Sequence, residues 1–223
     1  MNIMIVGAAG GVGHLLAKHF DTPLHHLYLV GHKEKVHIPY NGQAIYTDFT
    51  SEKNVEAVFS RIKTLNLLIN AQGVTADNLI KNMGKSEWDM VLDVNLASVF
   101  LACKHAYFKM KPLSHIINFS SVLAKTGMIG ASNYAASKGA IESFTKSFAL
   151  EAIRNAVFVN CISLGYFDIG MGRRLSDKIT RSVERKIPLG YFGHKDEILK
   201  LVEYIIQSTY LVGQTIELNG GLT

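Results

Sequence analysis

Short apolar runs alternate along this chain with longer segments in which apolar residues recur every three or four positions. The short runs are typical of buried strands and predict seven of them, at residues 3–6, 27–30, 44–46, 67–70, 116–119, 157–162 and 215–218. The longer segments predict helices at residues 12–20, 54–63, 87–109, 134–154 and 196–207. Alternating strands and helices form a parallel sheet covered on both faces, so the predicted fold is a doubly wound, Rossmann-type α/β domain with seven parallel strands.

Length and composition place the whole chain in one folded unit. Its 223 residues are 48% hydrophobic and 18% charged, so we expect a single domain over residues 1–223. The apolar runs are far shorter than the roughly 20 residues of a membrane span, and no membrane association is expected. The N-terminus leads directly into the first predicted strand and lacks the features of a signal peptide, which favours a cytoplasmic protein.

Charge, cysteine and histidine content argue against several other functions. The formal net charge is +5, but the basic residues are scattered and no nucleic-acid motif accompanies them, so DNA or RNA binding is not expected. Cys103 and Cys161 lie far apart in the sequence and are expected to be reduced, buried thiols. None of the nine histidines has a metal-binding spacing, so we expect no metal site.

The densest polar stretch lies at residues 165–188, after the sixth predicted strand. Ligands of open α/β sheets bind beyond the carboxyl ends of the strands, where this stretch would begin. Its helical and basic character predicts a lid that closes over a substrate.

A glycine-rich loop connects the first predicted strand to the first predicted helix. It comprises Gly7, Ala8, Ala9, Gly10, Gly11, Val12 and Gly13. Residues without a Cβ allow a tight turn and a close approach to a pyrophosphate, whose charge the helix N-terminus stabilises. An ordinary glycine turn is the alternative, but the position between strand and helix favours a dinucleotide site.

The end of the second predicted strand bears on the choice of dinucleotide. An acidic residue there binds the ribose 2′-hydroxyl of NAD, whereas basic groups accommodate the 2′-phosphate of NADP. Here the strand is followed by His32 and Lys33, which favours NADP(H). NAD(H) is the alternative if the strand continues further, because Glu34 would then face the ribose.

Tyr134 and Lys138 stand four residues apart on a predicted helix and therefore share one of its faces. A free tyrosine has a pKa near 10, and a neighbouring cation lowers that pKa toward the range useful for acid catalysis. Ser121 follows the fifth predicted strand, which places its hydroxyl at the carboxyl edge of the sheet. The three residues are candidate catalytic groups, although a Tyr–Lys pair also occurs on solvated helix faces.

Asn95 interrupts the apolar periodicity of the helix predicted at residues 87–109. An asparagine in the middle of a helix usually has a specific hydrogen-bonding reason. It is a further candidate for the site, with a hydrogen-bonded core asparagine as the alternative.

These motifs together resemble the short-chain dehydrogenase/reductase family over essentially the whole chain. The matching residues are Gly7, Gly11, Gly13, Asp48, the run Asn70-Ala71-Gln72-Gly73, Asn95, Ser121, Tyr134, Lys138, Asn160, and the closing Gly213-Gln214-Thr215 and Asn219-Gly220-Gly221. Among family members the chain looks most like the 3-oxoacyl-thioester reductases.

The resemblance implies a catalytic role for four residues. Tyr134 would protonate the substrate oxygen as a hydride arrives from the nicotinamide, and Ser121 would hydrogen-bond that oxygen. Lys138 would bind the nicotinamide ribose and lower the pKa of the tyrosine, while Asn95 would hold a water of the proton relay.

The resemblance also implies further cofactor contacts. Asp48 and Phe49 would border the adenine, and Asn70, Ala71 and Gly73 would line the ribose side of the pocket. Gly165 and the Phe167 backbone would lie near the nicotinamide.

The chain departs from the family pattern at several positions of the cofactor site. Val6 and Gln72 replace a threonine and an alanine, and the segment from Leu164 to Ile169 lacks the usual proline and threonine. Residues 31–40 leave little room for the usual helix between the second and third strands. These departures are expected to weaken cofactor binding without abolishing it.

The basic residues suggest a partner. Lys109, Lys111, Arg154, Arg173 and Arg174 could form a rim that attracts an acidic acyl carrier protein, although an ordinary solvated surface explains them equally well. Reduction of another ketone or of a pteridine, and a noncatalytic nucleotide-sensing role, remain as alternatives. The long apolar helices at 87–109 and 134–154 predict a homo-oligomer, a dimer or a tetramer.

Overall fold

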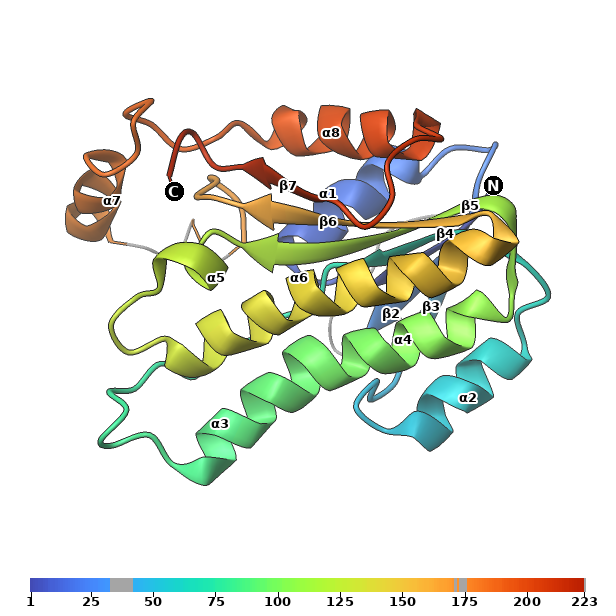
Figure 1. Ribbon diagram of the computed structural model, residues 1–223, viewed down its shortest axis with the longest axis horizontal. Helices are drawn as coiled ribbons and strands as arrows, with labels where there is room; N and C mark the ends of the chain where they lie inside the picture. Colours follow the sequence, from blue (N-terminus) through green and yellow to red (C-terminus); the bar gives the residue numbers. More distant parts are fainter. Residues whose placement is uncertain (33–41, 171, 173–175, 223) are drawn as a thin grey trace.

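The computed structural model describes residues 1–32, 42–170, 172 and 176–222. Seven strands form one parallel sheet in the order β3-β2-β1-β4-β5-β6-β7. Helices cover both faces of this sheet (Figure 1). The predicted fold class is therefore confirmed.

All seven predicted strands are present. Their bounds are β1 Asn2–Val6, β2 His26–Gly31, β3 Gly42–Tyr46, β4 Leu65–Asn70, β5 Met110–Ser121, β6 Val157–Leu164 and β7 Thr215–Leu218. The helices are α1 Gly11–Phe20, α2 Glu52–Ser60, α3 Lys85–Leu92, α4 Ser98–Tyr107, α5 Leu123–Thr126, α6 Ser132–Ala152, α7 Asp177–Glu184 and α8 Lys195–Gln207.

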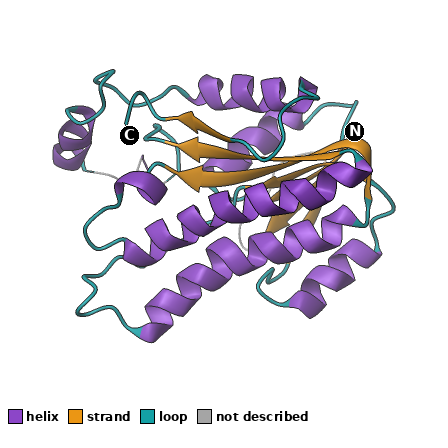
Figure 2. Cartoon of the chain, in the orientation of Figure 1, coloured by secondary structure: helices purple, strands orange, loops and turns teal. Residues whose placement is uncertain are grey.

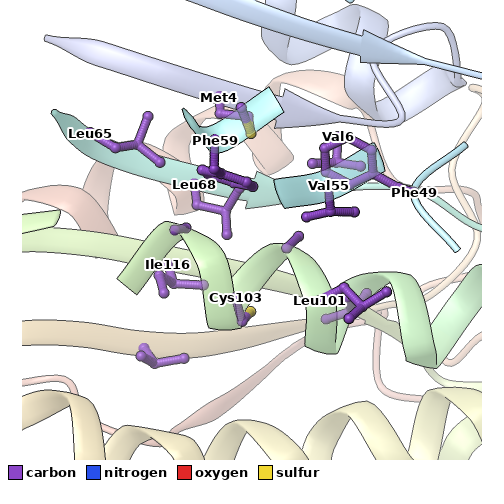
Figure 3. Close-up of a cluster of buried hydrophobic side chains, with 14 of the residues drawn as sticks. Met4, Val6, Phe49, Val55, Phe59, Leu65, Leu68, Leu101, Cys103 and Ile116 are labelled. Carbon is purple, nitrogen blue, oxygen red and sulfur yellow. The ribbon is translucent and has the colours of Figure 1, made fainter. Parts of the chain in front are cut away.

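Side chains of the inner strands alternate between two cores, one on each face of the sheet. Met4 and Val6 belong to the core shared with α2, α4 and α6, whereas Ile3 and Ile5 belong to the core shared with α1 and α8. Figure 3 shows part of the first core around Leu68 of the sheet. Burying one such aliphatic side chain stabilises the fold by about 1.5–3 kcal/mol, so the alternation specifies which face each helix covers.

The helix predicted at residues 87–109 is two helices joined by a π-helical turn, Asp93–Ala97, and it ends earlier than predicted, at Tyr107. Asn95, which interrupts the apolar period, lies in the centre of this turn. Wide turns of this kind occur mostly as single insertions in helices and frequently at functional sites.

Strand β5 begins earlier than the predicted 116–119, and the part that was not predicted is irregular. Met110 pairs with Leu65, and the register then shifts before His115 pairs with Leu67. Leu113 has a positive φ of 66° in this segment. Pro112 and this bend interrupt the pattern that is typical of a strand, so the sequence did not predict where β5 begins.

The basic rim predicted from the sequence is wrong for three of its members. Lys109 and Lys111 lie at the start of β5, and Arg154 follows the end of α6. Ser121 and Tyr134 lie at the opposite ends of these two elements. The strand arrows in Figure 2 point away from the edge that carries the three basic residues. Arg173 and Arg174 lie outside the described residues.

The described part of the chain has neither a membrane-spanning helix nor a cluster of metal-binding side chains. None of its helices has the length and apolar character needed to cross a membrane. No group of three or more His, Cys, Asp and Glu side chains lies within reach of a shared metal ion in the same residues.

Candidate active site

The glycine loop turns sharply from β1 into α1. Gly7 has a positive φ of 81°, and the amides of Gly7 and Ala8 both donate to Val30 O at 3.0 Å. A hydrogen bond of 2.9 Å from Gly10 N to Gly7 O closes the turn. Ala9 and Gly10 are exposed, so the loop and the first amides of α1 present an open, electropositive backbone surface.

Gly11 and Gly13 of this loop have backbone neighbours too close for any Cβ. A Cβ on Gly13 would lie 2.1 Å from Gly7 O, and one on Gly11 would lie 2.3 Å from the Gly170 Cα. Because Gly13 has no side chain, α1 can begin directly against the turn. Because Gly11 has none, Gly170 of the predicted lid can pack against the glycine loop. This cradle of backbone fits the pyrophosphate of a dinucleotide.

The residues that follow β2 and β3 were predicted to contact the cofactor. His32 is exposed after β2, whereas Lys33 lies outside the described residues, as do the rest of 33–41. Asp48 accepts hydrogen bonds from Thr50 N (2.8 Å) and Thr50 Oγ1 (2.7 Å). These bonds, and more weakly the nearby His32, hold the pKa of Asp48 below its usual value. The Phe49 ring is buried against Phe59, so only its backbone is available to a cofactor.

The segment after β4 runs beside the glycine loop. A Cβ on Gly7 would lie 2.6 Å from Gln72 N, and one on Gly73 would lie 3.5 Å from Lys138 Nζ. Ala71 N donates to Val6 O at 3.0 Å. This segment therefore connects the glycine loop to the catalytic candidates.

Two side chains of the same segment point away from a cofactor. Asn70 Nδ2 donates to Asn118 Oδ1 (2.8 Å) and contacts Cys103 Sγ (3.3 Å) in the core beneath α4. Gln72 Nε2 donates to Ser98 Oγ at 2.9 Å. The Asn70 side chain is thus part of the core. Only the backbone of Asn70 could line the ribose side of the pocket, where the residue was predicted.

Ser121, Tyr134 and Lys138 meet at the carboxyl edge of the sheet. Ser121 ends β5 and hydrogen-bonds the Tyr134 side chain, while its Oγ also accepts from Leu123 N at 3.2 Å. Lys138 lies one helical turn after Tyr134 on α6, with its Nζ 5.7 Å from the tyrosine ring centroid. The Lys138 Nζ donates to Phe119 O at 2.9 Å. The structure brings these three candidates together.

Burial dominates the electrostatics of this group. It raises the pKa of Tyr134 to about 12, against the opposing effect of the Ser121 hydrogen bond. It lowers the pKa of Lys138 to about 8, which leaves the amine mostly protonated at neutral pH. The expected lowering of the tyrosine pKa by Lys138 is not found in this geometry, because the amine points to a carbonyl and burial outweighs its charge. A protonated phenol is the form that a general acid needs.

Asn95 is fully buried and holds the segment after β4. Its Oδ1 accepts from Val74 N at 2.8 Å, and its Nδ2 donates to Val74 O and to Ser137 Oγ at 3.0 Å each. The alternative of a hydrogen-bonded core asparagine therefore describes its side chain in this structure. These bonds hold Val74 against the buried cluster to which Tyr134 belongs.

Gly165 and Phe167 begin the stretch predicted to form a lid. A Cβ on Gly165 would lie 2.6 Å from the Asn219 Cα, so its absence allows the C-terminal segment to approach. Phe167 is buried in the core beneath α8, where its ring packs on Gly193. A cofactor contact from Phe167 would come from its backbone, as predicted.

Three neighbours of Tyr134 were not predicted from the sequence. Asp77 and Tyr166 both act on the tyrosine electrostatically and raise its pKa, less than burial does. Asn133 accepts a hydrogen bond from Tyr134 N at 2.8 Å. Only the adjacency of Asn133 to Tyr134 was a signal in the sequence, since the other two residues reach the site through tertiary folding.

Comparison with known proteins agrees with these observations. A family model described as enoyl-(acyl carrier protein) reductase matches residues 7–223. The chain is 31% identical to a 3-oxoacyl-[acyl-carrier-protein] reductase of Rickettsia bellii, over 98% of this chain and 95% of the relative. It is 32% identical to the enzyme of that name from Escherichia coli, over 82% of this chain and 78% of the relative.

Solved structures show the same fold at lower identity. A dehydrogenase/reductase from Sinorhizobium meliloti superposes with a TM-score of 0.91 at 22% identity, covering 100% of this chain and 94% of that one. A short-chain dehydrogenase/reductase variant from Serratia marcescens has a TM-score of 0.89 at 22% identity, covering 99% and 97% of the two chains. This chain belongs to the short-chain dehydrogenase/reductase family of oxidoreductases.

Proposed function

We propose that this protein is an NADP(H)-dependent reductase of ketones, with 3-oxoacyl thioesters as its substrates and Tyr134 as its general acid. The observation that carries the proposal is the meeting of Ser121, Tyr134 and Lys138 at the carboxyl edge of the sheet. The segment after β4 joins this group to the glycine loop, so both lie along one continuous surface.

Each residue of the site has a separate role in this proposal. When bound, the reduced nicotinamide supplies the hydride. The buried Tyr134 phenol donates its proton to the substrate oxygen, and the Ser121 hydroxyl hydrogen-bonds the same oxygen. Lys138 would hold the nicotinamide ribose with its ammonium group. Asn95 would contribute by fixing Val74 beside the tyrosine and by ordering a water between these groups.

Preference for NADP(H) over NAD(H) rests on the end of β2. His32 is exposed there, and Lys33 follows it in the sequence. A charged hydrogen bond to a 2′-phosphate is worth about 1.5–3 kcal/mol, so NADPH should bind roughly 10-fold or more tightly than NADH.

The substrate class rests on the relatives, whose names specify 3-oxoacyl groups on an acyl carrier protein. Reduction of another small carbonyl or of a pteridine is the alternative within the family. An acidic acyl carrier protein is the proposed partner, and its approach would be past the exposed Arg181 of α7 and the exposed Arg185 that follows this helix. We expect no nucleic-acid partner and a cytoplasmic location.

Residues 165–188 are proposed to act as a lid within the single domain 1–223. Gly170 lies against Gly11 of the glycine loop, so the beginning of this stretch borders the cofactor cradle. Movement of the stretch would open or close that cradle.

The decisive assay is titration with NADPH and NADH separately, followed by reduced-nicotinamide oxidation on adding acetoacetyl thioester or a panel of small ketones. Tighter NADPH binding with thioester-dependent oxidation is expected. Oxidation only with another ketone or a pteridine would favour the alternative substrate. Failure to bind either nucleotide would contradict the proposal and favour a noncatalytic role.

A further inference from the structure

Asn133, next to the catalytic candidate Tyr134, is a fully buried side chain that joins three segments. Its Oδ1 accepts from Tyr134 N at 2.8 Å. Its Nδ2 donates to Ala76 O at 2.9 Å and, more weakly, to Glu87 O at 3.4 Å. One amide therefore links the first turn of α6 to the segment after β4 and to the start of α3.

The segment at residues 74–78 forms a wall beside the tyrosine. Val74 and Ala76 both pack against the Tyr134 cluster. The wall is held at alternate residues: Asn95 bonds both backbone groups of Val74, Asn133 bonds Ala76, and Asn78 N donates to Gly130 O at 2.8 Å. Asn133 is the only one of these anchors that also bonds the backbone of Tyr134 itself.

The chemistry of this link makes it specific. A buried amide must satisfy its donor and acceptor together, because a buried polar group without a partner is destabilising. An aliphatic residue at position 133 would leave Ala76 O without its bond. The wall and the tyrosine would then be free to move apart. Displacements of about 1 Å in reacting groups can cost 10²-fold in rate.

We infer that Asn133 is a positioning residue, which fixes the Tyr134 phenol at a set distance from the wall at residues 74–78. The inference rests on the proposed reductase function and deepens it. Asn133 touches neither substrate nor cofactor in this role. It acts through the tyrosine backbone on one side and through Ala76 on the other.

The same link sets the charge environment of the phenol. The groups that face Tyr134 are Ser121 at the end of β5, Lys138 on α6, Asp77 on the wall and Tyr166 after β6. Asp77 directly follows Ala76, so the bond from Asn133 holds the backbone that carries this carboxylate. The Glu87 carboxylate of α3 is turned to Gly84 N, at 2.7 Å. Loosening the wall would admit water to the phenol and lower its raised pKa toward the ordinary value.

The test compares Asn133→Ala and Asn133→Asp with a matched control, Asn160→Ala. Asn160 is also fully buried and makes two backbone hydrogen bonds, to Leu211 O at 2.9 Å and from Gln214 N at 3.0 Å, but it supports β7 instead of the site. Asn133→Asp keeps the size and the acceptor toward Tyr134 N, and as a carboxylate it loses the donor toward Ala76 O. This isosteric variant preserves the test if Asn133→Ala does not fold.

The measurements are kcat and KM for NADPH-dependent ketone reduction, the NADPH Kd, and the pH profile of kcat up to about pH 10. Both Asn133 variants should lose roughly 10- to 100-fold in kcat with the NADPH Kd changed less than about 2-fold. The Asn133→Ala rate should decline at a lower pH than the wild-type rate, because a deprotonated tyrosine cannot donate. The carboxylate of Asn133→Asp should raise the phenol pKa, as Asp77 does, so this variant should lose kcat without that shift. Asn160→Ala should keep the wild-type kcat and pH profile.

Two results would overturn the inference in distinguishable ways. An active wild type with Asn133 variants of unchanged kcat and pH profile would refute the positioning role alone. A wild type that reduces no ketone would overturn the proposed function and the inference with it.

Discussion

At the residue scale, Gly13 shows how one missing side chain shapes the cofactor cradle. A Cβ there would lie 2.1 Å from Gly7 O, so the Gly13→Ala variant must displace the turn before α1. We expect a loss of about 1–3 kcal/mol in stability from this overpacking and at least roughly 10-fold weaker NADPH binding. Nucleotide titration and urea unfolding measure the two effects.

Gly139 provides the matched control for that variant. It also lies in a helix, α6, but a Cβ there would meet only Ala124 O, at an ordinary 3.9 Å. Gly139→Ala should therefore be neutral or stabilising by up to about 1 kcal/mol, because alanine favours helices. Equal NADPH affinity in the two variants would show that the tight turn at Gly13 is not needed for binding.

His115 should make stability depend on pH. Its ring is buried and stacked on Phe158, with centroids 5.1 Å apart, and burial lowers its pKa from 6.5 to about 4. Between pH 6.5 and 4, His115 is therefore protonated in the unfolded chain but not in the folded protein. The free energy of unfolding falls as the pH drops through this window. The expected loss is on the order of 2 kcal/mol.

Urea unfolding at several pH values between about 7 and 4, for the wild type and for His115→Leu, checks this expectation. The variant should show a shallower loss of stability over the window. The same pH dependence in both proteins would assign the loss to other groups.

The catalytic candidates could be predicted from sequence because their spacing has a local meaning. Tyr134 and Lys138 share a helix face, and Ser121 ends a strand, so secondary structure alone brings them near one edge. Asn70 and Phe49 follow strands too, but their side chains turn into the core. Asp77 reaches Tyr134 only through the path of an irregular segment, which no period in the sequence describes.

At the element scale, the strands were predictable and the ends of helices were not. The inner strands contain runs of buried residues, whereas β3 and β7, at the two edges of the sheet, are exposed or half-buried, and the sequence pattern still predicted all seven. The break at Asp93–Ala97 depends on the bonds of Asn95 to Val74, twenty-one residues away in the chain. Contacts between residues so far apart in the chain cannot be predicted from local sequence, where the only sign of the break is an asparagine at an apolar position.

The two basic elements should contribute differently to recognition of an acidic carrier. Arg181 of α7 and Arg185, which directly follows this helix, are exposed, whereas Lys109 and Lys111 flank the first residue of β5, far from Ser121. Charge reversal of the two arginines should raise KM for a carrier-linked substrate roughly 5- to 10-fold, an effect that weakens with added salt.

The control is charge reversal of Lys109 and Lys111, which should leave that KM unchanged. The KM for a small thioester without a carrier should be the same in all variants. A larger effect from the β5 lysines than from the α7 arginines would contradict the proposed approach through α7.

At the scale of the whole molecule, the outer face of α4 and α6 predicts self-association. Phe144 contacts Phe100 edge-on and stacks on Phe148, with centroids 6.3 and 5.6 Å apart. Phe100 is 45% exposed and Leu150 is 70% exposed. Exposed large apolar side chains on neighbouring helices commonly mark a protein interface, and we expect a second copy of the chain to cover them.

Light scattering should therefore give a dimer or tetramer, and the double variant Phe100→Ser, Leu150→Ser should shift the mass toward the 24.6 kDa of one chain. Leu24→Ser, at an 80% exposed site in the turn before β2, is the control and should keep the wild-type mass. A wild-type protein of monomeric mass at working concentration would refute this expectation.

The most direct measurement compares ketone reduction by the wild type and by Tyr134→Phe, with NADPH saturating and its Kd measured in parallel. Tyr210→Phe, at a 97% exposed position, controls for loss of a hydroxyl elsewhere. Tyr134→Phe should bind NADPH within about 2-fold of the wild type and lose 10²–10⁴-fold in kcat, the usual cost of removing a general acid. A Tyr134→Phe protein that turns over at the wild-type rate would contradict the assignment of Tyr134 as the proton donor.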